Sequence, residues 1–283
     1  MDDDITLKYP YPPEIAERLE NCLSFGNTGI VEIVPPGNQV RKAPHPQTRG
    51  HDRQWQIHQL RREIRAYERL PQRHDRLVPL LGCSAGTDEV FITLEYMKAG
   101  TLSEYLSSTG LISCRQRMTW CYEAAEAVAL LHSHGIIHAD IKPANMVLDD
   151  NLGLRIIDFS GCAIDNSKPL CFESARYFLP RDINVHPCSV QTDLFALGSS
   201  LFEIITGSPP YSHLDENDIE EKYREGDFPS IKGLVYGSII EACWKQEFKS
   251  AEEVKRAIRD DHIPPTVPWQ ALFHPLVATS TTS

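Results

Sequence analysis

The sequence has no apolar segment that approaches the roughly 20 residues needed to cross a membrane. Its first residues, Met1-Asp2-Asp3-Asp4, are acidic and have no apolar stretch behind them. This pattern argues against a secretory signal and against an Arg-rich transit peptide, and Asp2 excludes N-myristoylation. We therefore expect no membrane association and an intracellular location, either cytoplasmic or nuclear.

The cysteines form no C-x-x-C pair and no regular framework of spacings. Without a signal peptide, eight scattered cysteines favour reduced thiols over disulfides or a metal site. We expect them to be small, mostly buried core residues. They are Cys22, Cys83, Cys114, Cys121, Cys162, Cys171, Cys188 and Cys243.

The chain also has fewer basic than acidic residues. Against 39 Asp and Glu residues stand 28 Lys and Arg, which gives a formal net charge of −11. Such an acidic chain is a poor partner for nucleic acid or for an anionic membrane surface. The 283 residues, 41% hydrophobic and 24% charged, are typical of a globular protein of one or two domains.

Strand-like runs dominate the first third of the chain, and helical patterns dominate the rest. The apolar spacing predicts one helix over 54–70, stopped by Pro71, among strands at 23–42, 77–83 and 90–96. A long helix follows over 113–134, with Ser113 as its N-cap and Gly135 just past its end. Short strands are expected at 146–148 and 154–157, and further helices at 190–206, 215–224, 234–246 and 250–260.

This order of elements predicts an α+β fold in two unequal lobes, a small β-rich lobe with one helix and a larger, mostly helical lobe. We expect an N-terminal extension over 1–19, the first lobe over 20–96, the second over 97–262, and an irregular tail over 263–283. There are no internal repeats.

The chemistry is concentrated in His138-Ala139-Asp140-Ile141-Lys142-Pro143-Ala144-Asn145, followed by Asp158-Phe159-Ser160. This pair of motifs resembles the catalytic loop and the Mg²⁺-binding motif of protein kinases, and the resemblance covers roughly residues 20–260. It implies that Asp140 orients the attacking hydroxyl and takes its proton, and that Lys142 steadies the γ-phosphate. Asn145 and Asp158 would supply oxygen ligands to Mg²⁺. In isolation, the two aspartates would be interpreted as turn residues.

The upstream sequence resembles the part of a kinase that holds the nucleotide. Ser24, Gly26, Gly29 and Val31 match the Gly-rich loop, in which glycines let backbone N–H groups approach phosphate. A Gly-x-x-Gly pair alone is also a common turn.

Lys42 matches the lysine that holds the α- and β-phosphates of ATP, and Glu63 matches the helix glutamate that pairs with it. Glu68 is the second candidate for that glutamate. Without the other motifs, each would be read as an exposed charge.

The segment Phe91–Met97 resembles the connection between the two kinase lobes. By this match Leu94 is the gatekeeper, and the backbone of Glu95 and Met97 binds adenine. Asp193 matches the large-lobe aspartate that holds the backbone of the catalytic loop.

The resemblance implies a protein serine/threonine kinase that uses ATP and Mg²⁺, acts on protein substrates and is a monomer. Lys142-Pro143 favours Ser/Thr over Tyr acceptors within the family. A pseudokinase that binds nucleotide or acts as a scaffold remains an alternative, as does a small-molecule kinase of related fold.

Four positions depart from the family pattern. Ser24 replaces the first glycine of the loop. Ala139 replaces an arginine that commonly grips an activation-loop phosphate, so we expect activity without that phosphorylation. Ser160 replaces a glycine, and a positive φ there would cost about 1–2 kcal/mol. Arg181 replaces the glutamate that, in the family, pairs with a distant buried arginine. The counterpart of that arginine lies near Phe248-Lys249 and is also missing. Because both partners are lost, neither remains as a buried unpaired charge.

Overall fold

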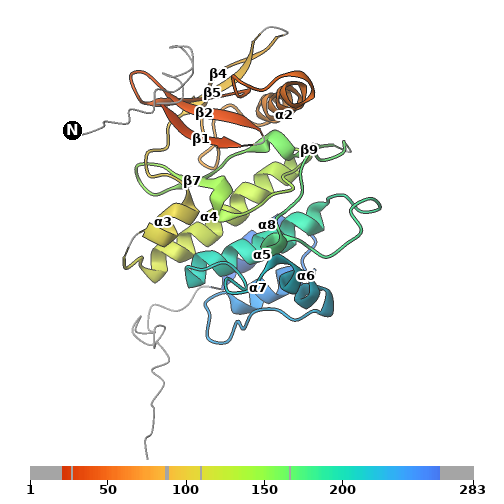
Figure 1. Ribbon diagram of the computed structural model, residues 1–283. Coiled ribbons are helices and arrows are strands. Elements are labelled where there is room, and N and C mark those ends of the chain that lie inside the picture. The colour runs from red at the N-terminus through yellow and green to blue at the C-terminus, as the bar shows by residue number, and fades with distance from the viewer. Residues whose placement is uncertain (1–20, 27, 87–88, 109, 166, 262–283) are drawn as a thin grey trace, which may run out of the picture. The chain divides into compact units, whose positions relative to one another are not determined.

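The protein is described by a computed structural model (Figure 1). The structure describes residues 21–26, 28–86, 89–108, 110–165 and 167–261. The expected N-terminal extension over 1–19 and the tail over 263–283 lie outside these residues. The chain divides into two compact units: one holds the residues up to Arg73 together with Val78–Tyr96, and the other holds His74–Leu77 and the residues from Met97 onward.

The first unit is an antiparallel five-stranded sheet, in the order β1-β2-β3-β5-β4, with one helix, α2 (Figure 1). Its elements are β1 (Cys22–Gly26), β2 (Gly29–Val34), β3 (Gln39–Ala43), α2 (Gly50–Arg69), β4 (Leu80–Ala85) and β5 (Val90–Glu95). In the register, Lys42 of β3 lies opposite Val31 of β2 and Ile92 of β5.

Helix α2 follows the apolar spacing of the sequence. Ile57, Leu60 and Ile64 recur at intervals of three and four residues and form its buried face. The helix ends at Arg69, because Leu70 precedes a proline and takes an extended conformation, with φ −80° and ψ 157°. It begins at Gly50, four residues before the predicted start.

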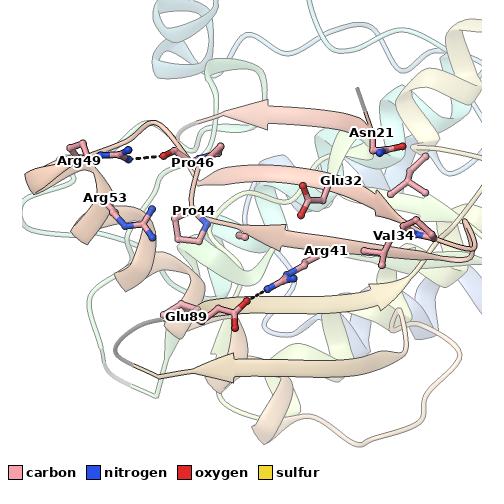
Figure 2. A pocket seen from close by; sticks show the side chains of 13 residues that line it. Asn21, Glu32, Val34, Arg41, Pro44, Pro46, Arg49, Arg53 and Glu89 are labelled. Carbon is pink, nitrogen blue, oxygen red and sulfur yellow. Dashed lines mark hydrogen bonds and ion pairs between the residues drawn. The ribbon is translucent and has the colours of Figure 1, made fainter. Parts of the chain in front are cut away.

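Successive side chains of β3 point to opposite faces of the sheet, so Arg41 and Lys42 lie on different sides. On the Arg41 face, the first unit has a hollow of about 760 Å³ (Figure 2). Arg41 and Glu89 form an ion pair at this hollow, and Glu32, Pro44 and Arg53 also line it.

The second unit is mostly helical (Figure 1). Its helices are α3 (Leu102–Ser108), α4 (Cys114–Ser133), α5 (Val190–Thr206), α6 (Glu216–Glu225), α7 (Gly237–Trp244) and α8 (Ala251–Asp260). Two short antiparallel pairs accompany them: β6 (Ile136–Ile137) with β9 (Ala163–Ile164), and β7 (Met146–Leu148) with β8 (Leu154–Ile156).

Polar caps begin α4 and α5, and the Ser113 cap of α4 was predicted from the sequence. Ser113 accepts a hydrogen bond from the Gln116 N–H at 3.2 Å and begins α4. Ser189 and Thr192 form a capping box at the start of α5, and Gly207 ends it with φ 82°. Large apolar side chains, among them Trp120 of α4 and Phe195 of α5, are completely or almost completely buried.

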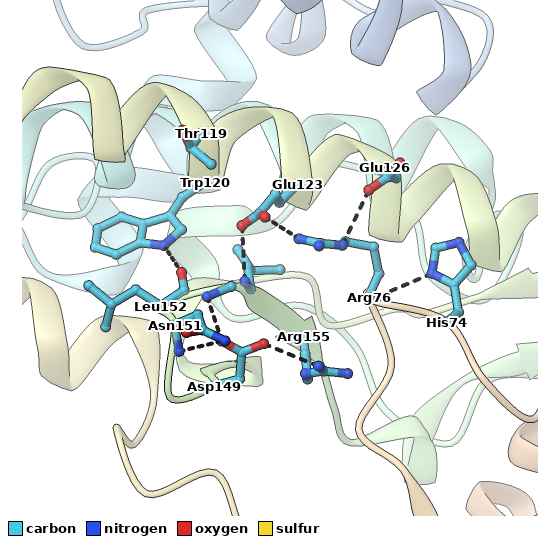
Figure 3. Close-up of polar contacts among 12 residues, drawn as sticks. His74, Arg76, Thr119, Trp120, Glu123, Glu126, Asp149, Asn151, Leu152 and Arg155 are labelled. Atoms are coloured by element: carbon cyan, nitrogen blue, oxygen red, sulfur yellow. Dashed lines mark hydrogen bonds and ion pairs between the residues drawn. The ribbon is translucent and has the colours of Figure 1, made fainter.

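The segment His74–Leu77 joins α2 to β4 but is held by the second unit. The Arg76 guanidinium forms ion pairs with Glu123 and Glu126 on one face of α4 (Figure 3). The Ile156 N–H donates to the Arg76 carbonyl at 2.9 Å, and Arg155 Nη1 donates to the Leu77 carbonyl at 2.8 Å.

The sequence prediction of an α+β fold, with a β-rich first part and a helical second part, is confirmed. Among the helices built from the described residues, none has both the length and the apolar character that crossing a bilayer requires.

Candidate active site

In the first unit, the Lys42 ammonium group pairs with the Glu63 carboxylate at 2.8 Å. Lys42 comes from β3 and Glu63 from the buried face of α2, and the side chains are 10% and 1% exposed. The other candidate, Glu68, lies on the exposed side of the same helix. Because both partners are buried, removal of one would leave an uncompensated charge in the core of the unit.

The predicted Gly-rich loop is the hairpin of β1 and β2. Ser24 pairs with Val31 in the register, and Gly26 pairs with Gly29. Gly29 has φ 130°, and a Cβ on it would lie 2.2 Å from the Ala43 carbonyl oxygen, so close packing on β3 alone demands glycine there. A Cβ on Gly26 would have no neighbour within 4 Å, so packing within the described residues does not account for that glycine.

The predicted adenine-binding residues lie at and just after the end of β5. The Glu95 N–H already donates to the Pro79 carbonyl at 3.1 Å, which leaves its carbonyl as the backbone group for adenine. Met97 is 8% exposed, and its carbonyl accepts from the Gly100 N–H at 3.1 Å, which leaves its N–H. The first unit thus offers a backbone acceptor at Glu95, and the second unit offers a backbone donor at Met97.

In the second unit, Asp193 of α5 fixes the start of the loop that carries Asp140. Its carboxylate accepts hydrogen bonds from the N–H groups of His138 at 2.8 Å and Ala139 at 2.9 Å. His132 Nε2 lies 3.0 Å from the same carboxylate, which is completely buried. These contacts hold Ala139 in a left-handed conformation, with φ 65°, directly before Asp140.

Asp140, Lys142 and Asn145 form one cluster. Asp140 Oδ2 accepts from Asn145 Nδ2 at 2.9 Å and lies 2.7 Å from Lys142 Nζ. Asn145 Nδ2 also donates to the Asp140 carbonyl at 2.8 Å. Asp140 Oδ1 has no hydrogen-bond partner among the described residues. Oδ2 therefore has two partners and Oδ1 is buried without one in the part of the chain that the structure describes, while the Asp140 side chain as a whole is 20% exposed. A carboxylate held in this way can act as a general base.

Asp158 follows β8 and has a left-handed backbone, with φ 66°. Its Oδ1 accepts from the Ser160 hydroxyl at 2.7 Å. Phe159 is completely buried and packs edge to face on His138, with ring centroids 5.8 Å apart.

The strain expected at Ser160 is not found. The positive φ values in this region belong to Ala139 and Asp158, whereas Ser160 lies in a 3₁₀ turn, Phe159–Gly161. Serine therefore replaces glycine here without a left-handed backbone, and its hydroxyl adds a hydrogen bond to Asp158.

The structure gives Arg181 a partner that the sequence analysis did not identify. Arg181 Nη2 lies 2.8 Å from Glu173 Oε2, and the side chains are 6% and 0% exposed. Sequence analysis missed Glu173, and it also missed His132 beside Asp193. The available signal was weak: an arginine in an apolar stretch calls for a carboxylate, but spacing does not identify which one.

The residues present fit a divalent cation. Because the amide nitrogen of Asn145 donates twice to Asp140, its amide oxygen is left as a hard ligand, and Asp158 contributes a carboxylate. These are the ligand types that Mg²⁺ prefers. The described residues contain no cluster of three or more His, Cys, Asp and Glu side chains that could hold a metal alone. Phosphate oxygens and water would complete the coordination of the ion.

Comparison with known proteins now settles the family. The protein kinase domain matches residues 40–260 of the chain. The chain belongs to the protein kinase family. Its relatives include the leucine-rich repeat receptor protein kinase MSL1 of Oryza sativa, 31% identical over 206 residues, which are 66% of this chain and 14% of the relative.

Two bacterial serine/threonine-protein kinases are also similar to this kinase domain. PrkC of Bacillus subtilis is 26% identical over 218 residues, which are 72% of this chain and 33% of the relative. PknB of Mycolicibacterium smegmatis is 28% identical over 164 residues, which are 51% of this chain and 26% of the relative. The kinase domain therefore matches a third or less of the length of these three relatives.

Proposed function

We propose that this kinase domain transfers the γ-phosphate of ATP to serine or threonine hydroxyls of proteins. The observation that carries the proposal is the cluster around the partly exposed Asp140 carboxylate, whose Oδ2 is held by Lys142 and Asn145. Serine/threonine specificity is supported by the names of distant relatives and by Lys142-Pro143 in the loop.

The chain's own residues would act as follows. Lys42, held by Glu63, would bind the α- and β-phosphates. The backbone of Gly26 and neighbouring loop residues, including Ser24, Gly29 and Val31, would cover the phosphates and the base. The Glu95 carbonyl and Met97 N–H would bind adenine.

In the second unit, the Asp140 carboxylate would orient the substrate hydroxyl and accept its proton. Lys142 would balance the negative charge that develops on the γ-phosphate. Asn145 and Asp158 would hold Mg²⁺, which neutralises phosphate charge when it is bound.

The test is transfer of labelled phosphate from ATP with Mg²⁺ to an array of peptides, comparing wild type with Asp140→Asn. Asp150→Asn is the matched control, because Asp150 is an exposed aspartate in the nearby turn between β7 and β8. We expect Asp140→Asn to lose at least about 100-fold in kcat, within the range that general-base catalysis contributes. Equal rates for Asp140→Asn and wild type would reject the proposal.

A pseudokinase is the second candidate, favoured by the departures at Ser24 and Ala139. It predicts that ATP with Mg²⁺ raises the Tm of wild type and of Asp140→Asn alike, without transfer of phosphate by either. Phosphorylation of a sugar or an antibiotic, with no protein product, would instead point to a small-molecule kinase.

We further propose that the domain acts as a monomer in a reducing compartment, cytoplasmic or nuclear. All eight cysteines are free thiols in the structure, which supports the second point. Size-exclusion chromatography with light scattering tests the first.

A further inference from the structure

The chain between Asp158 and α5 contains a buried ion pair in its second half. Glu173 and Arg181 lie eight residues apart, and their side-chain contact is 2.8 Å long. Arg181 also donates to three backbone carbonyls, those of Leu179 at 3.0 Å, His186 at 2.9 Å and Pro187 at 2.6 Å. One guanidinium group therefore closes the loop from residue 173 to residue 187.

A second arginine attaches the same segment to the loop between α5 and α6. Arg176 donates to the carbonyls of Pro210 and Leu214, each at 2.9 Å, and to that of Tyr211. The Tyr177 hydroxyl donates to Glu203 of α5. The segment is thus fixed to the helical part of its own unit through charged and buried polar groups.

The start of the segment packs on the loop that carries Asp140. The Leu170 N–H donates to the Gly161 carbonyl at 2.8 Å, and Cys171 Sγ lies 3.7 Å from the Ala139 carbonyl. A Cβ on Gly161 would lie 1.9 Å from Cys171 Sγ, so the Cys171 side chain packs directly on the Gly161 backbone. Order in this segment and the position of Asp140 are consequently linked.

Phosphorylation commonly orders such segments by giving an arginine a phosphate to bind. Here residue 139 is a fully buried alanine. Of the five hydroxyl side chains over 159–189, four take part in hydrogen bonds: those of Ser160, Ser167, Tyr177 and Ser189. Ser174 is exposed and lies beside Glu173 in the sequence.

We propose that the Glu173–Arg181 ion pair replaces a phosphate in ordering residues 171–187, so that the kinase is active without phosphorylation of this segment. Glu173 and Arg181 are positioning residues, because they act on the Asp140 loop through the packed segment. The inference rests on the proposed phosphotransfer function.

The pKa of Glu173 supports this role. Burial raises it above the ordinary value of a glutamate, and the hydrogen bond and charge of Arg181 oppose the rise. Loss of Arg181 would therefore favour a protonated Glu173, which can no longer tie the segment together.

The test compares wild type with Arg181→Ala and Glu173→Gln after phosphatase treatment, with the absence of phosphate verified by mass spectrometry. Lys245→Ala is the control, because it removes an exposed ion pair with Glu241 in α7. Amide hydrogen exchange over 171–187 and the kcat and KM for ATP and for a protein substrate are measured. Glu173→Gln keeps the shape of the side chain and remains informative if Arg181→Ala fails to fold.

We expect dephosphorylated wild type to retain its activity. In the two variants, exchange over 171–187 should rise about tenfold or more, and kcat/KM for the protein substrate should fall about tenfold with KM for ATP unchanged. Lys245→Ala should match wild type in both measurements.

Loss of activity from wild type on dephosphorylation would overturn the inference, and so would unchanged exchange in folded Arg181→Ala and Glu173→Gln. If wild type transfers no phosphate in either state, the proposed function fails. Hydrogen exchange then still decides whether the ion pair orders the segment.

Discussion

The contacts of Asp193 allow a quantitative prediction for the substitution Asp193→Asn. The wild-type carboxylate accepts two backbone hydrogen bonds, from His138 and Ala139, and is completely buried. Asparagine has the same shape but only one acceptor oxygen, so one backbone N–H loses its partner and faces an NH₂ group.

A hydrogen bond to a charged group contributes about 1.5–3 kcal/mol, and a buried donor left unpaired costs about 1–3 kcal/mol. We therefore expect Asp193→Asn to lower the free energy of unfolding by about 3 kcal/mol. At about 2–4 °C per kcal/mol for a domain of this size, the Tm should fall by about 6–12 °C.

The effect on catalysis should be comparable in free energy to the effect on stability. Ala139 is held at φ 65°, a conformation that costs a non-glycine residue about 1–2 kcal/mol, and Asp193 binds its N–H. With this bond weakened, the loop can relax and displace Asp140. A misplacement of about 1 Å can cost about 100-fold in rate, so we expect kcat to fall by that order.

Urea and thermal melts measure the stability change, and the labelled-ATP assay measures kcat, with Asp150→Asn as the exposed control. An ordinary surface substitution changes the free energy of unfolding by no more than about 0.5 kcal/mol. If Asp193→Asn stays within that range and keeps the wild-type kcat, Asp193 does not hold this loop in the way described.

Three further predictions concern other parts of the chain. Glu63→Gln should destabilise the domain by about 3 kcal/mol and abolish phosphotransfer, since it removes the carboxylate that pairs with the buried Lys42 ammonium group, whereas Glu68→Gln should do neither in the same melts and assays. Gly29→Ala should lower the Tm clearly and Gly26→Ala hardly at all, because only the first places a Cβ 2.2 Å from a carbonyl; similar Tm values would contradict the packing argument. Burial alone would raise the pKa of Asp149, but the N–H groups of Gly153 and Asn151 and the Arg155 side chain bring it below the ordinary value (Figure 3). The stabilisation from Asp149 is therefore present above pH of about 4 and lost as the pH falls through the lower folded-state pKa, so urea melts of wild type and Asp149→Asn should converge only in that acid range.

Local signals predicted much of the fold. Ser113, Gly207 and Pro71 mark the ends of helices through capping and backbone restriction, which depend on a few neighbouring residues. The start of α2 was predicted four residues late, because its first turn is polar and exposed and leaves no apolar periodicity to detect.

The site residues likewise divide into those that local sequence patterns predict and those that only the packing reveals. Residues 138–145 and Asp158 are recognisable because phosphotransfer needs particular side chains at particular spacings. The pairing of Arg181 with Glu173, and of His132 with Asp193, depends on tertiary packing, which a single sequence does not encode in its spacing. The strain assigned to Ser160 was wrong because it assumed that the backbone of the family's glycine persists when the residue changes.

The attachment of Arg76 has a consequence for how this protein can be divided. A fragment ending at Tyr96 would contain the whole five-stranded sheet and α2, yet it would also carry an arginine whose two glutamate partners lie on α4. Conversely, a fragment starting at Met97 would present Glu123 and Glu126 as adjacent, uncompensated acids. The chain thus enters the helical unit at His74–Leu77, between two parts of the β-rich unit, so truncation between Tyr96 and Met97 would destabilise both fragments.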